Sequence, residues 1–344
     1  MRKTLALCAV LAVSLTACSG GSNAAAPEPA DTEFSTLEEL VEAAEAEGSV
    51  RLYTSLLEPD LVKLVEGFES TYDIDIEDVR LGGTDAMNRF DSESAAKSRT
   101  ADVVVVNDTS FFGAATEKGT IVPLKETGVI PLVPDFPEEM LLEEEATAVL
   151  TVTNNGLAYN SDLVDEADVP DSWEELLDPR WTGKVLAVAP EASLANILTW
   201  SIVAESQGED FLTDFGAQIG RYYPNLVPMH EALAAGEGEL AVPSPEFFVA
   251  AQTASGQPLA FKSLSPNYYP AQALGISAAA EHPAAARLLV HYLMSEAGIG
   301  TITSGAGVYS PYDEAIPEDF RVPGVDEIAD IQSRQDEIVE QLKK

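Results

Sequence analysis

Polar side chains that could bind a small solute follow three successive strands predicted near the start of the chain. The candidates are Tyr53, Thr54 and Ser55 after the first strand, Thr84 after the second, and Asp108 after the third. A helix is expected to begin after each strand, and the first amides of a helix have no partner within it. Caps and turns use the same residue types, so the prediction of a binding edge rests on their coincidence at three strand ends.

Two pairs of adjacent tyrosines, each followed by proline, add further candidate ligand contacts. The pairs are Tyr222–Tyr223 and Tyr268–Tyr269. Neighbouring side chains of a strand point to opposite faces, whereas in a loop before proline both can face one cleft. Packing in a core or a hinge is the alternative for each pair. Ser193 and Asn196, at a helix start predicted after Pro190, complete the polar set.

Enzyme chemistry has no recognisable motif in this sequence. It contains no H-E-x-x-H, G-x-S-x-G, P-loop or G-x-G-x-x-G pattern. The histidines His230, His282 and His291 are not spaced as zinc ligands on one helix face. We therefore expect a protein that is not an enzyme and has no cofactor or metal centre. A secreted hydrolase that uses two carboxylates stays as an alternative, because acids are abundant and nothing selects a pair.

The charge balance excludes several classes of partner. The 344 residues include 58 Asp+Glu against 19 Lys+Arg, for a formal net charge of −39. Nucleic acids and anionic membrane surfaces attract clustered lysine and arginine, so neither is expected to bind. The length suggests two domains, and a hydrophobic content of 46% is too high for a disordered acidic chain. We interpret the acidity as a property of the surface, suited to a saline habitat.

The N-terminus predicts export and attachment to a membrane. A basic Met1-Arg2-Lys3 precedes an apolar run too short to span a bilayer, and Leu15-Thr16-Ala17-Cys18 resembles a bacterial lipobox. We expect residues 1–17 to be a signal peptide, Cys18 to be lipidated and 18–34 to form a flexible tether. The protein would be lipid-anchored on the extracytoplasmic face of the cell membrane. Ordinary secretion after cleavage near Ala17 is the alternative.

The rest of the chain alternates helix and strand patterns. A capping box from Ser35 to Glu38 predicts a first helix that stops at Gly48. Strands are expected over 50–57, 73–79 and 101–106, with helices beginning at Pro59 and over 86–98. Such strand–helix–strand units build a parallel sheet, so the fold class is α/β. A second capping box (Ser172, Glu175), core positions at Trp173, Leu176 and Trp181, and an amphipathic helix over 284–293 are also predicted.

Several segments resemble bacterial extracellular solute-binding proteins of ABC transporters. They are 101–106, 155–162, 169–185, 236–242 and 282–298, within a similarity that covers about 48–315. The branch includes ferric-ion-binding proteins. The resemblance implies the two-lobed type II periplasmic-binding fold, with an interlobe cleft and a hinge of strands that cross at 149–159 and 269–276. Lobe one would be 36–151 and 274–313, and lobe two 156–270, with 314–344 a helical segment that packs on lobe two.

The resemblance also implies a function. A monomeric receptor would close its lobes on a small solute and deliver it to an ABC permease. Ferric binders of this branch use two adjacent tyrosines after the Gly-Glu-containing strand, and this chain has Phe247-Phe248 there. We therefore expect a small polar organic or otherwise non-ferric solute, with ferric iron as the alternative. A surface adhesion or scaffold lipoprotein, which would bind no solute and not close, is a third possibility.

Overall fold

The first of two β-sheets contains strands from both ends of the chain. The structure, a computed structural model, describes residues 34–208 and 210–344, so the predicted signal peptide, Cys18 and nearly all of the tether lie outside it. In the described part, eight strands form this sheet, with the order β13-β6-β12-β3-β1-β2. Two short strands lie off this path: β4 pairs with β12, and β5 pairs with β6. The bounds are β1 Ser49–Thr54, β2 Asp75–Arg80, β3 Val103–Val106, β4 Ile121–Val122, β5 Leu141–Leu142, β6 Thr147–Thr153, β12 Ala271–Ser277 and β13 Val308–Tyr309.

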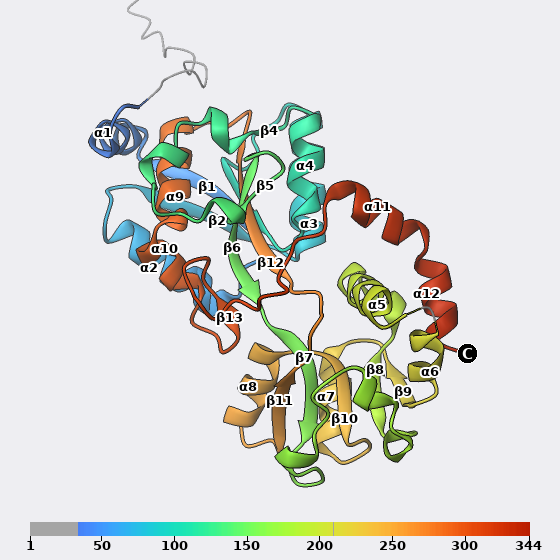
Figure 1. The fold of residues 1–344 in the computed structure, drawn as a ribbon. Coiled ribbons are helices and arrows are strands. Elements are labelled where there is room, and N and C mark those ends of the chain that lie inside the picture. The colour runs from blue at the N-terminus through green and yellow to red at the C-terminus, as the bar shows by residue number, and fades with distance from the viewer. Residues whose placement is uncertain (1–33, 209) are drawn as a thin grey trace, which may run out of the picture. The chain divides into compact units, whose positions relative to one another are not determined.

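The second sheet is built from the middle of the chain. Its described strands have the order β11-β7-β10-β8-β9 (Figure 1). β8 is parallel to both β9 and β10, whereas β7 is antiparallel to β10 and β11. The bounds are β7 Asn155–Asn160, β8 Val185–Val188, β9 Ile219–Tyr223, β10 Leu240–Pro245 and β11 Leu259–Ser263. This mixed α/β architecture agrees with the predicted fold class.

The helices fall into three groups: those beside the first sheet, those beside the second sheet, and those at the end of the chain. Those that flank the first sheet are α1 Leu37–Glu47, α2 Glu58–Glu69, α3 Gly83–Ala95, α4 Ser110–Glu117, α9 Pro283–Met294 and α10 Glu296–Ile302. Those beside the second are α5 Leu194–Gln207, α6 Phe211–Gly216, α7 Leu226–Ala234 and α8 Glu246–Ala254, and the chain ends with α11 Val325–Ser333 and α12 Gln335–Leu342. Short 3-10 helices cover Leu124–Glu126, Ile130–Leu132, Glu138–Met140, Glu166–Asp168, Glu174–Leu177, Pro179–Trp181 and Pro190–Ala192. None of the helices in the described residues is long and apolar enough to span a bilayer.

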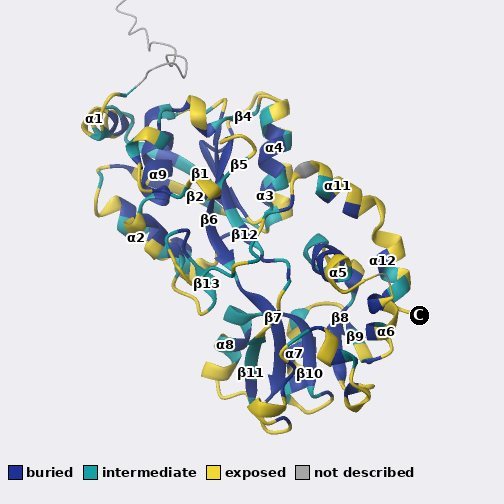
Figure 2. Ribbon diagram, in the orientation of Figure 1, coloured by how far each residue is buried: buried dark blue, intermediate teal, exposed yellow. Residues whose placement is uncertain are grey.

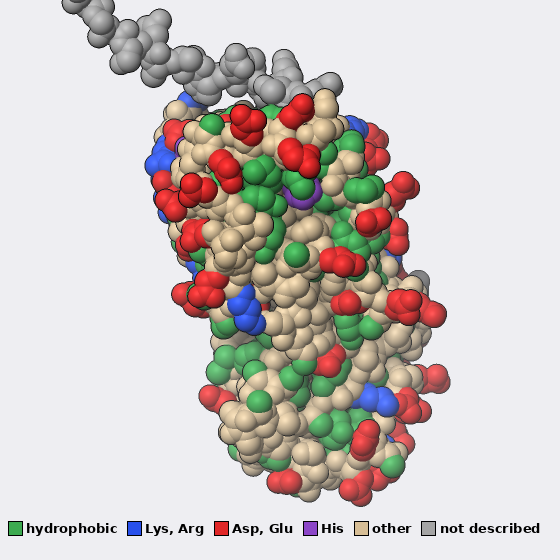
Figure 3. All heavy atoms as spheres, turned by 90° about the vertical axis from the view of Figure 1, so that its left-hand side faces the viewer, with side chains coloured by type: hydrophobic (Ala, Val, Ile, Leu, Met, Phe, Trp, Pro, Cys, Tyr) green, Lys and Arg blue, Asp and Glu red, His purple; other side chains and the backbone are tan. Residues whose placement is uncertain are grey.

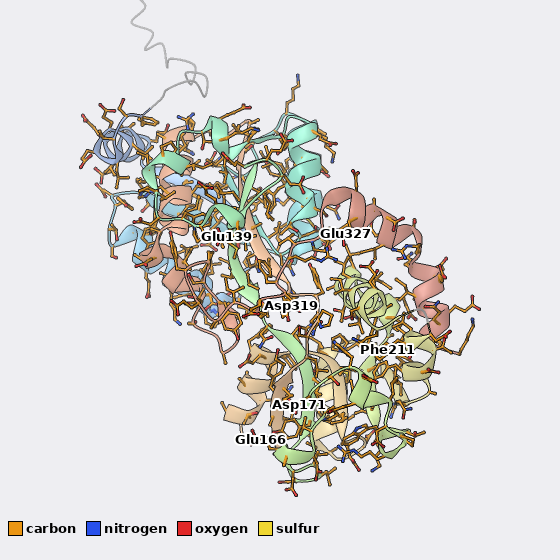
Figure 4. The ribbon with its side chains drawn as sticks, in the orientation of Figure 1. Glu139, Glu166, Asp171, Phe211, Asp319 and Glu327 are labelled. Atoms are coloured by element: carbon orange, nitrogen blue, oxygen red, sulfur yellow. The ribbon has the colours of Figure 1, made fainter. Side chains whose placement is uncertain are left out.

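Two crossings join the strands of the two sheets, and a third passage, 310–324, leads from β13 to the C-terminal helices beside the second sheet. β6 of the first sheet runs into β7 of the second with Asn154 alone between them, and residues 264–270 lead back from β11 to β12. At the second crossing Asp319, which lies between β13 and α11, accepts hydrogen bonds from Tyr269 and Ser265, at 2.8 and 2.9 Å. Asp319 is labelled beside this crossing in Figure 4. The crossings position whatever the strand ends present to a ligand.

We call the largest hydrophobic cluster of each sheet the first and the second core, and each sheet has a smaller separate cluster as well. Buried residues are dark blue in Figure 2. Leu52, Val103 and Leu289 are fully buried in the first. Trp173 and Trp200 lie at the centre of the second, with ring centroids 5.8 Å apart. The predicted core positions Leu176 and Trp181 are buried there too. In Figure 3 the acidic side chains are scattered over the visible face and are not gathered in one patch, as expected of a surface character.

Two details of the helix predictions were wrong. The first helix is capped by Thr36, not Ser35: the Thr36 hydroxyl accepts the Glu39 amide, and the Glu39 carboxylate accepts the Ser35 amide. The capping box is thus displaced by one residue, since Glu39 occupies the third helical position. The 284–293 helix is buried on all its faces, because α1, α10 and the sheet surround α9. At the predicted Ser172–Glu175 box, which starts a 3-10 helix, the Ser172 hydroxyl accepts the Glu175 amide at 3.3 Å, and the Glu175 carboxylate accepts the amide of Asp171 at 2.8 Å.

The C-terminal helices pack on the helices of the second sheet. Ile328, Ile331, Ile338 and Leu342 join the second hydrophobic core. α12 lies against α6, and α11 lies against α5 and also contacts α4 beside the first sheet. Glu327 and Phe211 in Figure 4 mark where α11 and α6 begin. The end of the chain is therefore part of the folded protein.

Candidate functional site

A cavity of about 380 Å³ opens at the carboxyl ends of the central strands of the second sheet. We call it the second-sheet cavity. Val188 ends β8 and Pro243 lies near the end of β10, and Asn155 begins the antiparallel strand β7. Pro270 of the second crossing also lines it. The cavity therefore lies where ligands bind in open α/β sheets, directly beside both crossings.

Three helices begin at the second-sheet cavity. The N-cap of α5 is Ser193, whose hydroxyl accepts the Asn196 amide at 3.3 Å, and the N-cap of α7 is Asn225, whose Oδ1 accepts the Val227 amide at 3.1 Å. α8 begins after Pro245 and has no side-chain cap. Helix amino ends carry partial positive charge and free amides, so the three together favour an acceptor or anionic group.

A second cavity, of about 270 Å³, lies at the carboxyl edge of the first sheet. We call it the first-sheet cavity. Ser55 follows β1 and Asn107 follows β3, and Thr151 and Gln272 come from the crossing strands β6 and β12. Ser55 donates to Gln272 at 3.4 Å. Pro245 and Pro270 line both cavities, so the two are adjacent.

Neither cavity has a basic lining. Asp60 of the first-sheet cavity is the one charged side chain among the described residues that line the two, and it accepts the Ser304 hydroxyl at 2.7 Å. The His230 ring packs against Phe248, with ring centroids 4.9 Å apart. Burial lowers the pKa of His230, which favours the neutral ring. Among the described lining residues, the positive partial charges at the second-sheet cavity are therefore those of the helix amino ends and not of basic side chains.

The structure brings some of the predicted contacts to these cavities. Ser193 and Asn196 line the second-sheet cavity, and Ser55 lines the first-sheet cavity. Asp108 and Thr84 line neither: Thr84 is exposed on α3, and Asp108 accepts the Ser110 amide and hydroxyl at 3.1 and 2.6 Å. Asp108 thus shapes the start of α4.

The prediction for Tyr53 and Thr54 needs correction. Both side chains are fully buried. The Tyr53 hydroxyl donates to Glu93 at 2.8 Å, and burial, followed by this bond, raises its pKa. Thr54 Oγ1 accepts the Leu56 amide at 3.1 Å. These residues belong to β1 itself, which ends at Thr54, so they pack within the lobe while Ser55 reaches the cavity.

The pair Tyr222–Tyr223 lies on an edge strand and not in a loop. The Tyr222 hydroxyl donates to the Leu342 carbonyl at 2.7 Å, and the Tyr223 hydroxyl donates to Glu237 at 3.1 Å. Burial and the nearby Glu191 carboxylate raise the pKa of Tyr222 to about 12. Both hydroxyls are used by the protein, and neither residue lines the second-sheet or the first-sheet cavity.

The pair Tyr268–Tyr269 is divided between the two hydrophobic cores. Tyr269 is buried in the first core, and its hydroxyl donates to Asp319. Tyr268 packs against the second core. Burial raises the pKa of Tyr268, and the Asp108 carboxylate raises it further. Packing at the hinge therefore describes the pair.

Sequence reasoning missed Asn155 and Asn225 as residues of the site. Asn225 could have been found as the residue before an apolar helix, where asparagine is a preferred N-cap. Asn155 begins a segment, 155–162, that was interpreted only through its resemblance to the family. Phe247 and Phe248 do reach the site: Phe247 lines the first-sheet cavity and Phe248 the second. Within the described residues, no group of three or more His, Cys, Asp or Glu could hold a metal ion.

Comparisons with known proteins agree with this geometry. Residues 98–330, more than half of the chain, match the family model described as bacterial extracellular solute-binding protein. An uncharacterized protein of Haemophilus influenzae is 22% identical over 207 residues, which are 58% of this chain and 59% of that relative. The match thus spans less than two thirds of the relative's length.

Solved structures share the fold. Iron-bound HitA from Pseudomonas aeruginosa is 19% identical, with a TM-score of 0.65 over 86% of this chain and 99% of that one. The periplasmic binding protein AfuA from Actinobacillus pleuropneumoniae, with fructose-6-phosphate bound, is 18% identical, with a TM-score of 0.61 over 86% and 99%. The family is one of binding proteins and not enzymes, so the hydrolase alternative is set aside. The chain belongs to the bacterial extracellular solute-binding proteins, the receptor family of ABC transporters, and has their two-lobed type II periplasmic-binding fold.

Proposed function

We propose that this chain is a membrane-anchored extracytoplasmic receptor that closes its lobes on a small polar organic solute and delivers it to an ABC permease. The observation that carries the proposal is the second-sheet cavity, which lies at three helix amino ends and beside both crossings. Its volume is in the lower part of the range found for small-molecule sites, which runs from about 300 to 1,000 Å³. The receptor would act as a monomer.

Lobe one would comprise residues 36–151 and 274–313, and lobe two 156–270, with 314–344 carried on lobe two. Two features support this division. The sheets have separate cores, and the chain passes between them at Asn154 and at 264–270, where a few backbone rotations could close the lobes.

A non-ferric solute is supported by the side chains at the site. The HitA structure holds iron, but this chain presents Phe247 and Phe248 to the cavities, and carbon-only rings supply no metal ligand. Ferric iron remains the alternative that the experiment must address.

Native mass spectrometry with metal analysis, on protein purified without refolding, tests the proposal. We expect a bound organic mass and iron far below one equivalent. Small-angle scattering before and after removal of that solute should show a smaller radius of gyration for the loaded protein. Iron near one equivalent would reject the organic solute, whereas absence of any solute and of any change in size would reject the receptor.

The anchor has its own test. Cys18→Ala should remove the lipid and move the protein from the membrane fraction to the medium, because acyl chains hold such a protein by about 0.8 kcal/mol per buried CH₂. Cys8→Ala is the matched control, since it lies inside the predicted signal peptide and should leave the anchor in place. Equal release of both variants would contradict lipidation at Cys18.

A further inference from the structure

The side-chain oxygen of Asn155 is a buried acceptor that the protein leaves unpaired. Asn155 lines the second-sheet cavity, is only 5% exposed, and its Oδ1 has no hydrogen-bond partner among the described residues. Its Nδ2 donates to the Tyr268 carbonyl at 3.5 Å. Turning the amide round would set Oδ1 against that carbonyl, and two acceptors cannot bond, so the orientation is fixed. Buried acceptors are normally paired, and a donor group on a solute would complete this one.

The remaining polar groups of the cavity favour a solute with a single negative charge. The amino ends of α5, α7 and α8 favour an anionic group; α8 has no side-chain cap, although its first residue is Glu246, whose amide donates to the Asn154 carbonyl at 3.1 Å. No Lys, Arg or His lies among the described residues that line the cavity, so a second negative charge would have no counterion. The net charge of −39 also repels multiply charged anions.

The walls determine the rest of the solute. Val188, Leu226, Pro243 and Phe248 make an apolar surface around a volume of about 380 Å³, which fits a small hydrocarbon body. No carboxylate lines the cavity, so an ammonium group would be desolvated without a counter-charge. The donor that pairs with Asn155 is therefore uncharged, and a hydroxyl is the simplest such group.

We propose that the second-sheet cavity selects a small hydroxylated organic monoanion with an apolar body, of which a branched 2-hydroxycarboxylate is the simplest example. The anionic group lies at the helix amino ends, the hydroxyl donates to Asn155 Oδ1, and the hydrocarbon packs against Phe248. This rests on the proposed function, because it names the solute class of that receptor. Since Asn155 follows the crossing residue Asn154, the same hydrogen bond would also favour the closed lobes.

Calorimetry with matched acids tests the selection. The probes are 2-hydroxy-4-methylpentanoate, 4-methylpentanoate without the hydroxyl, leucine, fructose-6-phosphate and ferric citrate, each titrated into solute-free protein. We expect the hydroxy acid to bind about tenfold more tightly than the acid without the hydroxyl, a difference of about 1.4 kcal/mol. Leucine, the sugar phosphate and the ferric complex should bind more weakly than either acid.

A variant pair at the crossing isolates the hydrogen bond. Asn155→Ala should abolish the tenfold preference, because it removes the acceptor. Asn154→Ala is the control: that neighbouring amide already bonds Glu246 and Ser263, and the variant should lower stability yet retain the preference. If Asn155→Ala does not fold, the comparison of the two acids on the unmodified protein decides alone.

The outcomes separate this inference from the proposed function. Equal affinity for the two acids, no binding of either, or tighter binding of leucine or fructose-6-phosphate would overturn the solute class while leaving a receptor for another solute. A preference that survives in Asn155→Ala would overturn the assigned contact. Only the absence of any co-purified solute and of any closure, in the experiments above, would overturn the receptor itself.

Discussion

The two cavities lie at equivalent edges of their sheets, yet their chemistry differs. In the first-sheet cavity two of the polar side chains are already paired: Ser55 donates to Gln272, and Asp60 accepts from Ser304. In the second-sheet cavity Ser193 and Asn225 cap their own helices, whereas Asn155 Oδ1 has no partner among the described residues and the walls are mostly apolar. A polar group at a strand end is therefore not enough for binding, because that group must also lack a hydrogen-bond partner within the protein. We infer that the second-sheet cavity contributes most of the affinity.

Filling each cavity in turn is the strongest way to break this comparison. Ala192→Trp puts an indole at the exposed rim of the second-sheet cavity, and Leu57→Trp does the same at the first, where Leu57 is 49% exposed. We expect the first change to weaken solute binding about 100-fold, or about 2.7 kcal/mol, and the second by less than about threefold. Calorimetry with the co-purified solute measures both. A larger loss in Leu57→Trp would reverse the assignment.

The hinge tyrosines sharpen the comparison through stability. Tyr269→Phe removes a hydrogen bond to the Asp319 carboxylate and should lower the free energy of unfolding by about 1.5–3 kcal/mol in urea titrations. Tyr268→Phe removes a hydroxyl for which no hydrogen bond is found among the described residues, and it should cost much less. Equal losses in the two variants would contradict the division of this pair between a bonded and an unbonded side chain.

The helix caps give a smaller effect that separates structure from binding. Thr36→Ala at α1 and Asn225→Ala at α7 each remove an N-cap and should each lower stability by about 1 kcal/mol. Only Asn225 lies at a cavity, so only its replacement should also weaken solute binding. If Thr36→Ala changed affinity as much, the caps would be acting through global stability.

The smallest expected effect is at alkaline pH. The pKa of Tyr222 is raised to about 12 in the folded chain, above its ordinary value of 10 in an unfolded one. A raised pKa means that its contribution to stability is complete below pH 10 and is lost as the pH rises towards 12. Urea unfolding of the native protein should weaken over that interval, and Tyr222→Phe should flatten the slope. Solute affinity should not differ between the two proteins, because Tyr222 lies away from both cavities.

Much of the fold could be predicted because its signals are local. The β-branched run at 103–106 predicted a buried strand, and the structure places β3 there between β1 and β12. The adjacent tyrosines show where local reasoning ends. Whether Tyr222 lies in a loop or a strand depends on its pairing with β8, and whether its hydroxyl is free depends on Leu342, 120 residues away.

The site was only partly predictable for the same reason. Ser193 and Asn196 could be placed because an N-cap is a local feature. Asn155 acquires its meaning only from the segments that surround it, namely the Tyr268 backbone and the helices α5, α7 and α8. No pattern within a few residues of Asn155 states that its oxygen has no partner.

The position of β12 has a consequence for how the protein is made. β12 lies between β3 and β6 in the first sheet, but its residues are synthesised after all strands of the second sheet. β12 has emerged only after about four fifths of the chain, and β13 joins the first sheet later still, whereas the five strands of the second sheet in the described part are contiguous in sequence. During export the second sheet is thus free to assemble first, and the cavity we assign to solute selection would take shape before its partner lobe exists.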